Sequence, residues 1–265
     1  MTKTAISVLG LSLFAASTSF AFDIEEQREL TLDAKAVQRL TVTAGAGFLK
    51  VVADEQATKI EVVGALNVDE GNFTFSLEQS GDVAKLVADA NTGNTSSWWG
   101  DGPKIDLTVK VPSHVFLDIE DGSGMIEIDG AGNGLKLNDG SGSISLRNIR
   151  GNVDVKDGSG SFSAENISGD LVLDDGSGSI RIEQVTGNVV VDDGSGSTLI
   201  ERVSGTVMVD DGSGSLTIAN IGGHVTIDDG SGGITLDQLE AGVTILNEGS
   251  GGLSMSNVKG QVEKR

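Results

Sequence analysis

The sequence of 265 residues contains no cysteine and no tyrosine, and only two prolines and two histidines. Without cysteine the chain can form neither a disulfide nor a thiolate metal site, so packing and hydrogen bonding have to stabilise it. The near absence of proline excludes collagen and proline-rich disorder. Basic residues are also scarce, 18 against 39 acidic ones, which leaves a formal net charge of −21. Such a chain repels nucleic acids and anionic lipids, whereas its charge is compatible with cationic binding partners.

Long hydrophobic runs are missing except at the start of the chain. Lys3, the apolar run from Ala5 to Ala16 and the small-residue ending Ser19-Phe20-Ala21 match the three parts of a secretory signal peptide. The run is too short to span a bilayer, and no later segment approaches a membrane span. We therefore predict a signal peptide at residues 1–21 and an exported protein that is periplasmic, displayed at the cell surface or secreted.

Glycine is abundant, at 38 residues, because it belongs to an internal repeat. The tetrapeptide Asp-Gly-Ser-Gly recurs every 18 residues, and Glu-Gly-Ser-Gly follows at Glu248 after a step of 19. The tetrapeptide begins at Asp121, Asp139, Asp157, Asp175, Asp193, Asp211 and Asp229. Eight copies in register indicate a repeat architecture.

Inside one repeat, residues 143–147 and 152–156 alternate polar and apolar, which predicts two strands with one buried face each. Stacking the repeats gives five apolar columns, and one of them, which includes Ile149, falls in a turn. In an antiparallel meander this residue would face water, whereas in a solenoid it fills an inward corner. We therefore predict an all-β fold, a single-stranded parallel β-solenoid (β-helix) with 18-residue coils over residues 121–265. The extra residue of the last step predicts a bulge near Leu246-Asn247.

The region between residues 22 and 120 is predicted to be β-rich but irregular. Strand-like runs lie at residues 29–32, 39–43, 48–52, 59–66, 73–78, 83–89 and 104–111. Residues 43–51 look like a degraded copy of the repeat, with Gly45-Ala46-Gly47 in place of Gly-Ser-Gly. We expect this region to be a modified start of the solenoid that also caps the stack, since an open terminal coil would offer unpaired strand edges.

A family resemblance follows from three features in order: the irregular β-rich start, Val111-Pro112 with the alternating strand 115–119, and the Gly-Ser-Gly coils. Together they resemble the bacterial "putative adhesin" proteins of unknown function, relatives of the head-GIN domain group. The likeness covers nearly all of the chain after the signal peptide. It implies a right-handed parallel β-solenoid at the cell envelope, and it supplies no catalytic residues.

Enzyme signatures are not met. Serine proteases carry the order Gly-Asp-Ser-Gly, and eight equivalent serines cannot share the two histidines, His114 and His224, for which we predict solvated or capping roles. Solenoid polysaccharide lyases and hydrolases place catalysis on long loops between coils, and the invariant 18-residue steps leave no such loops. We predict a protein that is not an enzyme and needs no cofactor; the alternative is a polysaccharide-active enzyme of unrecognised type.

The acidic residues of the repeat are the candidate metal site. One column contains Asp157, Asp175, Asp193, Asp211 and Asp229, and beside it lie Asp174, Asp192, Asp210 and Asp228. At a coil spacing of ~4.8 Å, adjacent like charges repel by roughly 0.9 kcal/mol in water. We predict that these carboxylates face outward along one edge and bind divalent cations such as calcium weakly and collectively. The alternative is that Asp before Gly satisfies turn amides and keeps the stack soluble.

Trp98 and Trp99 are the only tryptophans, and they lie in the polar stretch of residues 91–103. Paired indoles suit a sugar ring or a protein partner, and the alternative is that both rings are buried over the first coils. Taken with the export signal, these features predict a rigid, acidic surface for binding or adhesion at the cell envelope, with a polysaccharide or a protein as the partner.

Overall fold

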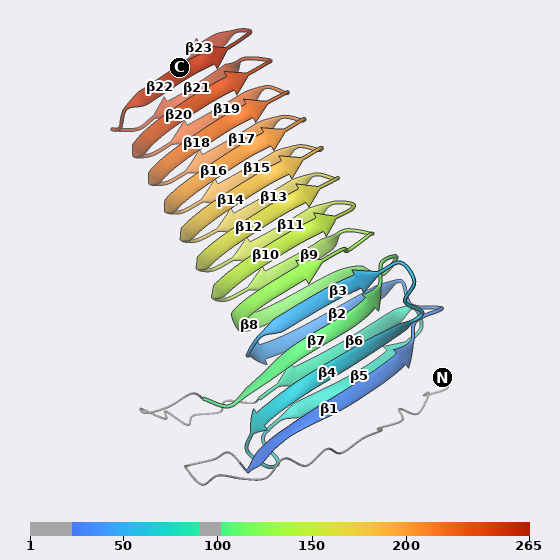
Figure 1. Cartoon of the computed structure of the whole chain (residues 1–265). Helices are drawn as coiled ribbons and strands as arrows, with labels where there is room; N and C mark the ends of the chain where they lie inside the picture. The colour runs from blue at the N-terminus through green and yellow to red at the C-terminus, as the bar shows by residue number, and fades with distance from the viewer. Residues whose placement is uncertain (1–22, 91–101) are drawn as a thin grey trace. The chain divides into compact units, whose positions relative to one another are not determined.

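The structure is a computed structural model and describes residues 23–90 and 102–265. Its regular elements are all β-strands, as Figure 1 shows. No helix in the described residues is long and apolar enough to cross a membrane. Two compact units divide the chain after Asn133. The predicted signal peptide and the tryptophan pair Trp98-Trp99 lie outside the described residues.

The second unit is a parallel β-solenoid whose strands alternate between two sheets (Figure 1). Sheet A contains β10 (Gly142–Ile149), β12 (Gly160–Ile167), β14 (Gly178–Val185), β16 (Gly196–Val203), β18 (Gly214–Ile221), β20 (Gly232–Leu239) and β22 (Leu253–Val258). Sheet B contains β9 (Leu135–Asp139), β11 (Val153–Asp157), β13 (Leu171–Asp175), β15 (Val189–Asp193), β17 (Val207–Asp211), β19 (Val225–Asp229), β21 (Val243–Glu248) and β23 (Val262–Lys264). Each strand pairs in parallel with the equivalent strand of the next coil.

The pairing register confirms the repeat step. Phe162 of β12 pairs with Ile180 of β14, and Leu171 of β13 pairs with Val189 of β15, so each residue lies beside the residue 18 positions later. Between β19 and β21 the register shifts after Ile227, and Leu246 is the extra residue. The predicted bulge is therefore confirmed.

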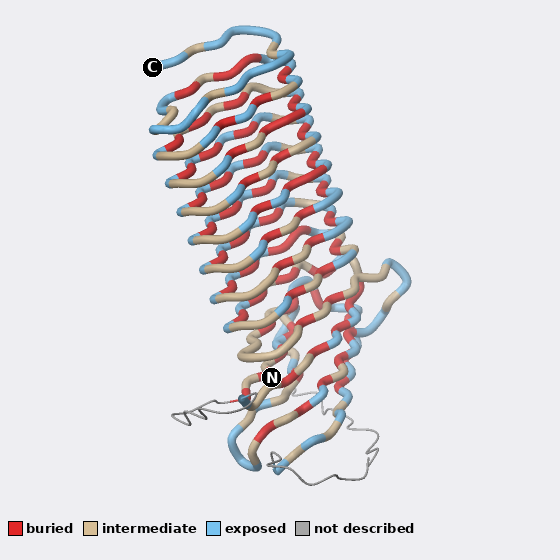
Figure 2. Tube along the Cα trace, turned by 60° about the vertical axis from the view of Figure 1, so that its left-hand side comes forward, coloured by how far each residue is buried: buried red, intermediate tan, exposed pale blue. Residues whose placement is uncertain are grey.

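The predicted apolar columns form the core of the solenoid, and in Figure 2 buried residues recur at the same places in successive coils. In one coil Ile180, Ile182, Val185, Val189 and Val191 are all buried. Because each side chain stacks on its equivalents in the coils above and below, every coil depends on its neighbours for burial.

Two different corners join the sheets. At the Gly-Ser-Gly corner, Gly160 has a φ of 139°, and a Cβ there would lie 1.5 Å from the carbonyl oxygen of Gly142. The backbones of successive coils thus touch, which only glycine allows. At the other corner one non-glycine residue per coil, such as Asn166 with a φ of 60°, takes the left-handed conformation, and the next residue, Ile167, is buried in the core.

The first unit contains solenoid-like layers as well. Its strands are β1 (Ile24–Asp33), β2 (Arg39–Ala46), β3 (Leu49–Asp54), β4 (Lys59–Val68), β5 (Thr74–Ser80), β6 (Val83–Asp89), β7 (Lys104–Pro112) and β8 (Phe116–Asp129). β2 and β3 pair in parallel with the two halves of β8, matching Ala44 with Asp121 and Leu49 with Ile126. Residues 43–51 are therefore a true, degraded coil.

Antiparallel strands complete the first unit. β6 and β7 pair in parallel with β2 and β3, and then β5 pairs antiparallel with β6 while β4 pairs antiparallel with β7. β1 extends the second of these sheets antiparallel to β4. The parallel layers of this unit are thus continued by hairpin strands, whose pairing occupies edge groups that would otherwise be open.

Candidate functional site

The predicted acidic edge is divided between two faces of sheet B. Asp174 and Asp175 are successive residues of β13, and successive side chains of a strand point to opposite faces. The inner column of aspartates is buried, with each member at most 4% exposed: Asp139, Asp157, Asp175, Asp193, Asp211 and Asp229. The prediction that all these carboxylates face outward along one edge is therefore wrong.

The inner column is held in line by the pairing of sheet B, which places Asp175 beside Asp193 and Asp193 beside Asp211. Asp175 Oδ1 accepts a hydrogen bond of 3.2 Å from the backbone N–H of Ser177, and Asp193 Oδ1 accepts one of 3.0 Å from Ser195. These bonds confirm that the aspartate before glycine satisfies turn amides.

The remaining oxygens of the inner column are poorly satisfied. Asp175 Oδ2 and both carboxylate oxygens of Asp211 are buried without a hydrogen-bond partner among the described residues. Asp193 is the exception, because the buried hydroxyl of Thr198 donates to its Oδ2 at 2.8 Å. Thr198 occupies a position that isoleucine, leucine or phenylalanine fills in other coils of this unit, and this bond explains why a polar residue is accommodated in the core.

Burial and like charge make these carboxyl groups weak acids. Burial, followed by the neighbouring carboxylate of Asp157, raises the pKa of Asp175 to about 6. Burial, with Asp193 and Asp229 on either side, raises the pKa of Asp211 to about 6 as well. The pKa values of Asp139, Asp157, Asp193 and Asp229 are raised in the same direction, in each case first by burial. The column can therefore take up protons close to neutral pH.

The described residues do not form a dedicated metal site. No group of three or more histidine, cysteine, aspartate or glutamate side chains that could hold an ion occurs in residues 23–90 and 102–265. The inner carboxylates stack in single file, so each has only its column neighbours as further carboxylate ligands, whereas calcium takes six to eight oxygens. Weak collective binding of calcium along the columns stays a prediction.

The outer face of sheet B carries the other aspartates. We call Asp174, Asp192, Asp210 and Asp228 the acidic stripe, since strand pairing sets them in one line. Beside it runs a second line, the apolar stripe, which consists of Val172, Val190 and Met208. These three side chains are 44%, 39% and 53% exposed. Lys156 precedes the acidic stripe and pairs with Asp174 at 3.2 Å. The face is thus flat, acidic and partly apolar.

Both histidines have structural partners. The Nε2 atom of His114 lies 3.2 Å from the carbonyl oxygen of Val37. The His224 ring bridges two neighbours of the next coil, with Nδ1 3.2 Å from the Ala241 carbonyl oxygen and Nε2 2.9 Å from Thr244 Oγ1. Each ring contacts a second segment of the chain, and His114 is exposed while His224 is half-buried, which agrees with the solvated or capping roles predicted from the sequence.

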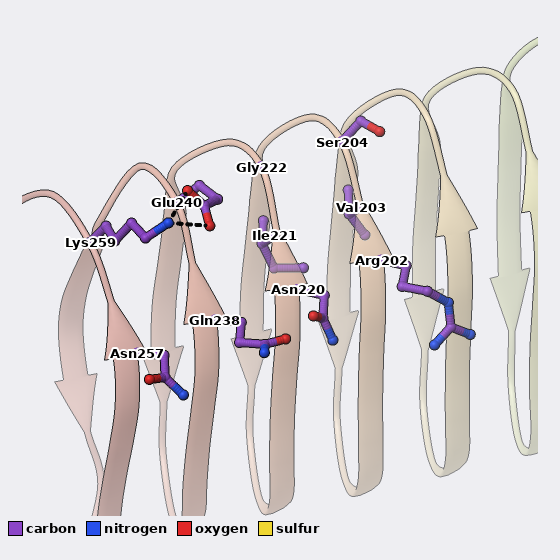
Figure 3. A pocket seen from close by; sticks show the side chains of 10 residues that line it. All are labelled: Arg202, Val203, Ser204, Asn220, Ile221, Gly222, Gln238, Glu240, Asn257 and Lys259. Carbon is purple, nitrogen blue, oxygen red and sulfur yellow. Dashed lines mark hydrogen bonds and ion pairs between the residues drawn. The ribbon is translucent and has the colours of Figure 1, made fainter.

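A groove at the corner where the sheet A strands end was not predicted. It has a volume of about 740 Å³ and is lined by Arg202, Asn220, Gln238 and Asn257, with Glu240 and Lys259 at its rim (Figure 3). The signal was present in the sequence, because an amide or guanidinium residue precedes the apolar turn residue in each of the seven coils from Asn148 to Asn257. This repeated position is hard to recognise in the sequence because it is occupied by three different residues, asparagine, glutamine and arginine.

No protein-family model matches the chain, and no curated protein is significantly similar to it in sequence. A putative lipid binding protein from Parabacteroides distasonis ATCC 8503 has a similar structure, with a TM-score of 0.52 at 15% identity over 92% of this chain and 98% of that chain. A putative cell adhesion protein from Clostridium sporogenes ATCC 15579 has a TM-score of 0.38 at 10% identity over 91% of this chain and 100% of that chain. The first likeness supports the fold. No family model supports the head-GIN relationship that the sequence suggested.

Proposed function

We propose that this protein is an exported, non-enzymatic β-solenoid that presents a rigid, acidic surface to a partner at the cell envelope. The observation that carries the proposal is the outer face of sheet B, where the acidic stripe runs beside the exposed apolar stripe. The core does not require these apolar side chains, because the opposite face of the same strands fills it. Contiguous exposed apolar residues rimmed by polar ones mark interaction surfaces.

The two stripes favour a protein partner with basic residues beside apolar ones. The acidic stripe contributes complementary charge, which speeds association and selects the partner, while the apolar stripe contributes buried area. A sheet held by parallel pairing on both sides changes little in shape on binding, so little conformational entropy is lost. The adhesion name of one structural neighbour is in keeping with such a role.

The alternative, a polysaccharide-active enzyme, needs two free carboxyl groups facing a cleft. Near the groove of Figure 3 the carboxylates are engaged in ion pairs instead. Glu183 pairs with both Arg181 and Arg202, and Glu240 pairs with Lys259 at 2.9 Å. This engagement supports a binding role over hydrolysis.

Export is tested by fractionating cells that produce the whole chain. We expect a shortened product in the periplasm, at the surface or in the medium. A full-length product confined to the cytoplasm would refute the proposal.

Binding is tested with a photo-crosslinking amino acid placed at Met208 of the apolar stripe or, as a matched control, at Thr217 on the outer face of sheet A. We expect adducts with an envelope protein from Met208 and none from Thr217. Reversing the charge of the acidic stripe with Asp192→Lys and Asp210→Lys should abolish these adducts. Equal labelling from both faces contradicts a specific surface.

A further inference from the structure

The corner at the end of the sheet A strands presents a line of polar side chains that folding alone does not explain. We call it the amide corner, and it consists of Asn148, Asn166, Gln184, Arg202, Asn220, Gln238 and Asn257. All seven residues have φ between 52° and 60°. Glycine adopts this left-handed conformation without strain and asparagine tolerates it, whereas glutamine and arginine are disfavoured there.

The residue choice at the amide corner points to the side chain. The chain uses glycine freely for positive φ elsewhere, as at Gly160 and Gly178. At the amide corner all seven positions instead carry a side chain with N–H donors, and only the equivalent position of the preceding coil, Gly130 with a φ of 84°, is a glycine. Strained backbone conformations are concentrated at functional sites.

Contacts between neighbouring coils account for only part of this line. Asn166 Nδ2 donates to Asn148 Oδ1 at 2.7 Å, as in a stabilising side-chain ladder. The side-chain amides of Gln184, Asn220 and Gln238 make no hydrogen bond to any described residue. Each of these three keeps two N–H donors and a carbonyl acceptor available to a ligand.

The unengaged amides line two hollows on the same corner. The larger, of about 740 Å³, contains Asn220 and Gln238 along one side, as Figure 3 shows. The smaller, of about 440 Å³, contains Gln184 together with Asn148 and Asn166.

Charges near the two hollows are neutralised within the protein. Lys259 pairs with Glu240 at 2.9 Å, Arg202 pairs with Glu183 and Glu201, and Arg147, which lines the smaller hollow, pairs with Glu165 at 4.0 Å. Each cation at the hollows thus has a carboxylate partner and the unengaged polar groups are neutral amides, which favours a neutral ligand over an anionic one.

We propose that the amide corner is a binding site for a linear, neutral polysaccharide. Sugar hydroxyls donate and accept hydrogen bonds, as amides do, so each amide can engage a hydroxyl in either direction. The amides recur at the coil step of ~4.8 Å, so a polymer of repeating units can make equivalent contacts along the corner. This surface is distinct from the acidic and apolar stripes, and the proposal does not depend on them.

The test is affinity electrophoresis of the whole chain in gels that contain hydroxyethyl cellulose, arabinoxylan, galactomannan or dextran, with alginate as an anionic comparison. We expect retardation by at least one neutral polymer and none by alginate. The variants Asn220→Gly and Gln238→Gly remove one amide each while keeping the left-handed backbone. Each variant should weaken binding about threefold to tenfold, and the double variant should weaken it further. Thr217→Val on the outer face of sheet A, which lines neither hollow, is the matched control and should bind as the parent does.

Thermal unfolding separates binding from folding, because glycine relieves backbone strain at these positions. We expect melting temperatures that are unchanged or raised in both glycine variants. A fall of more than about 4 °C would assign the amides a structural role and overturn the proposal. Binding that survives in the double variant, retardation by alginate alone, retardation by none of the neutral polymers, or preferential binding of an extended peptide would overturn it as well.

Discussion

Every coil of the solenoid turns twice, and the two corners place opposite demands on the sequence. At the Gly-Ser-Gly corner the backbones of successive coils touch, since a Cβ on Gly178 would lie 1.6 Å from the Gly160 carbonyl oxygen. At the amide corner the backbone requires only a positive φ, and asparagine, glutamine and arginine all occur there. The invariant glycines thus mark a steric demand of the backbone. At the amide corner the residue varies among side chains with N–H donors, so these side chains are free to make other contacts.

The corners also differ in which groups they bury. The Gly-Ser-Gly corner buries a carboxyl group, such as that of Asp211, with its neighbours above and below. The amide corner buries an apolar residue, such as Ile221, and leaves the amide of Asn220 at the surface of a groove. Stability should therefore respond to pH more strongly through the first corner, with its buried carboxyl groups, than through the second, where Asn257 donates to Asp237, a residue that is not buried.

The largest effect on stability should come from adding a methyl group at the Gly-Ser-Gly corner, where the backbones of successive coils touch. Gly178→Ala places a Cβ against the Gly160 backbone at a φ of 149°, and we expect a loss of at least about 4 kcal/mol in the free energy of unfolding. Gly233→Ala is the matched control, because its Cβ would meet only the Gly252 oxygen at 4.0 Å, and it should change stability by less than about 0.5 kcal/mol. Urea unfolding followed by circular dichroism measures both, and equal effects would contradict the backbone-contact account.

The second prediction concerns pH. The pKa of Asp211 is about 6 in the folded state against an ordinary 3.8, so the folded chain holds its proton more tightly than the unfolded chain does. Its contribution to stability is complete below pH 3.8 and is lost as the pH rises through 6. As the pH rises through this window, the free energy of unfolding of Asp211→Asn should fall by about 3 kcal/mol less than that of the parent.

Urea midpoints measured at intervals between pH 3.5 and pH 8 test this difference. Asp210→Asn, in the acidic stripe of the same strand, is the control and should change the slope much less, because its charge is the smallest of the influences that raise the Asp211 pKa. An Asp211→Asn variant with the same slope as the parent would show that the inner column does not titrate in this range.

The third prediction concerns the hydroxyl inside the core. Thr198→Val removes the hydroxyl that donates to Asp193 Oδ2, so this buried oxygen loses its hydrogen bond from Thr198. We therefore expect the free energy of unfolding to fall by about 2 kcal/mol. The pKa of Asp193 should rise further, because the Thr198 hydrogen bond lowers it. Thr217→Val on the outer face of sheet A should be nearly neutral. Comparable losses in the two variants would argue against a specific role for the Thr198 bond.

The smallest expected effect is that of calcium on the aspartate columns. Millimolar calcium should stabilise the chain more than sodium chloride of equal ionic strength, by no more than about 1 kcal/mol. Asp192→Asn with Asp210→Asn should reduce the difference between the salts. Identical melting temperatures in the two salts would leave charge screening as the only effect.

Much of the fold was predictable because a period of 18 residues makes each structural demand visible several times. The apolar columns, the bulge at Leu246 and the degraded coil around Gly45 were all found in this way. The burial of Asp175 was missed although its place two residues after Leu173 gives it the same inward parity as the core. Its polarity and the glycine after it suggested a turn at the surface.

The candidate site was less predictable than the fold. The amide corner consists of three residue types, so only the shared φ reveals them as one structural position. The apolar stripe also escaped notice, since Val172, Val190 and Met208 have the parity of an outward face, where single exposed apolar residues are common. Stacking of the coils is what makes these separate residues continuous.

The sequence by itself determined the coil length, the two strands of each coil and the glycines at one corner, because these follow from a local period and from steric demands that glycine alone meets. Only the tertiary structure decided which aspartates are buried, which amides remain unengaged and where the exposed apolar residues form a line. These properties depend on residues 18 positions apart lying beside one another, and burial and hydrogen bonding are set by such neighbours in space.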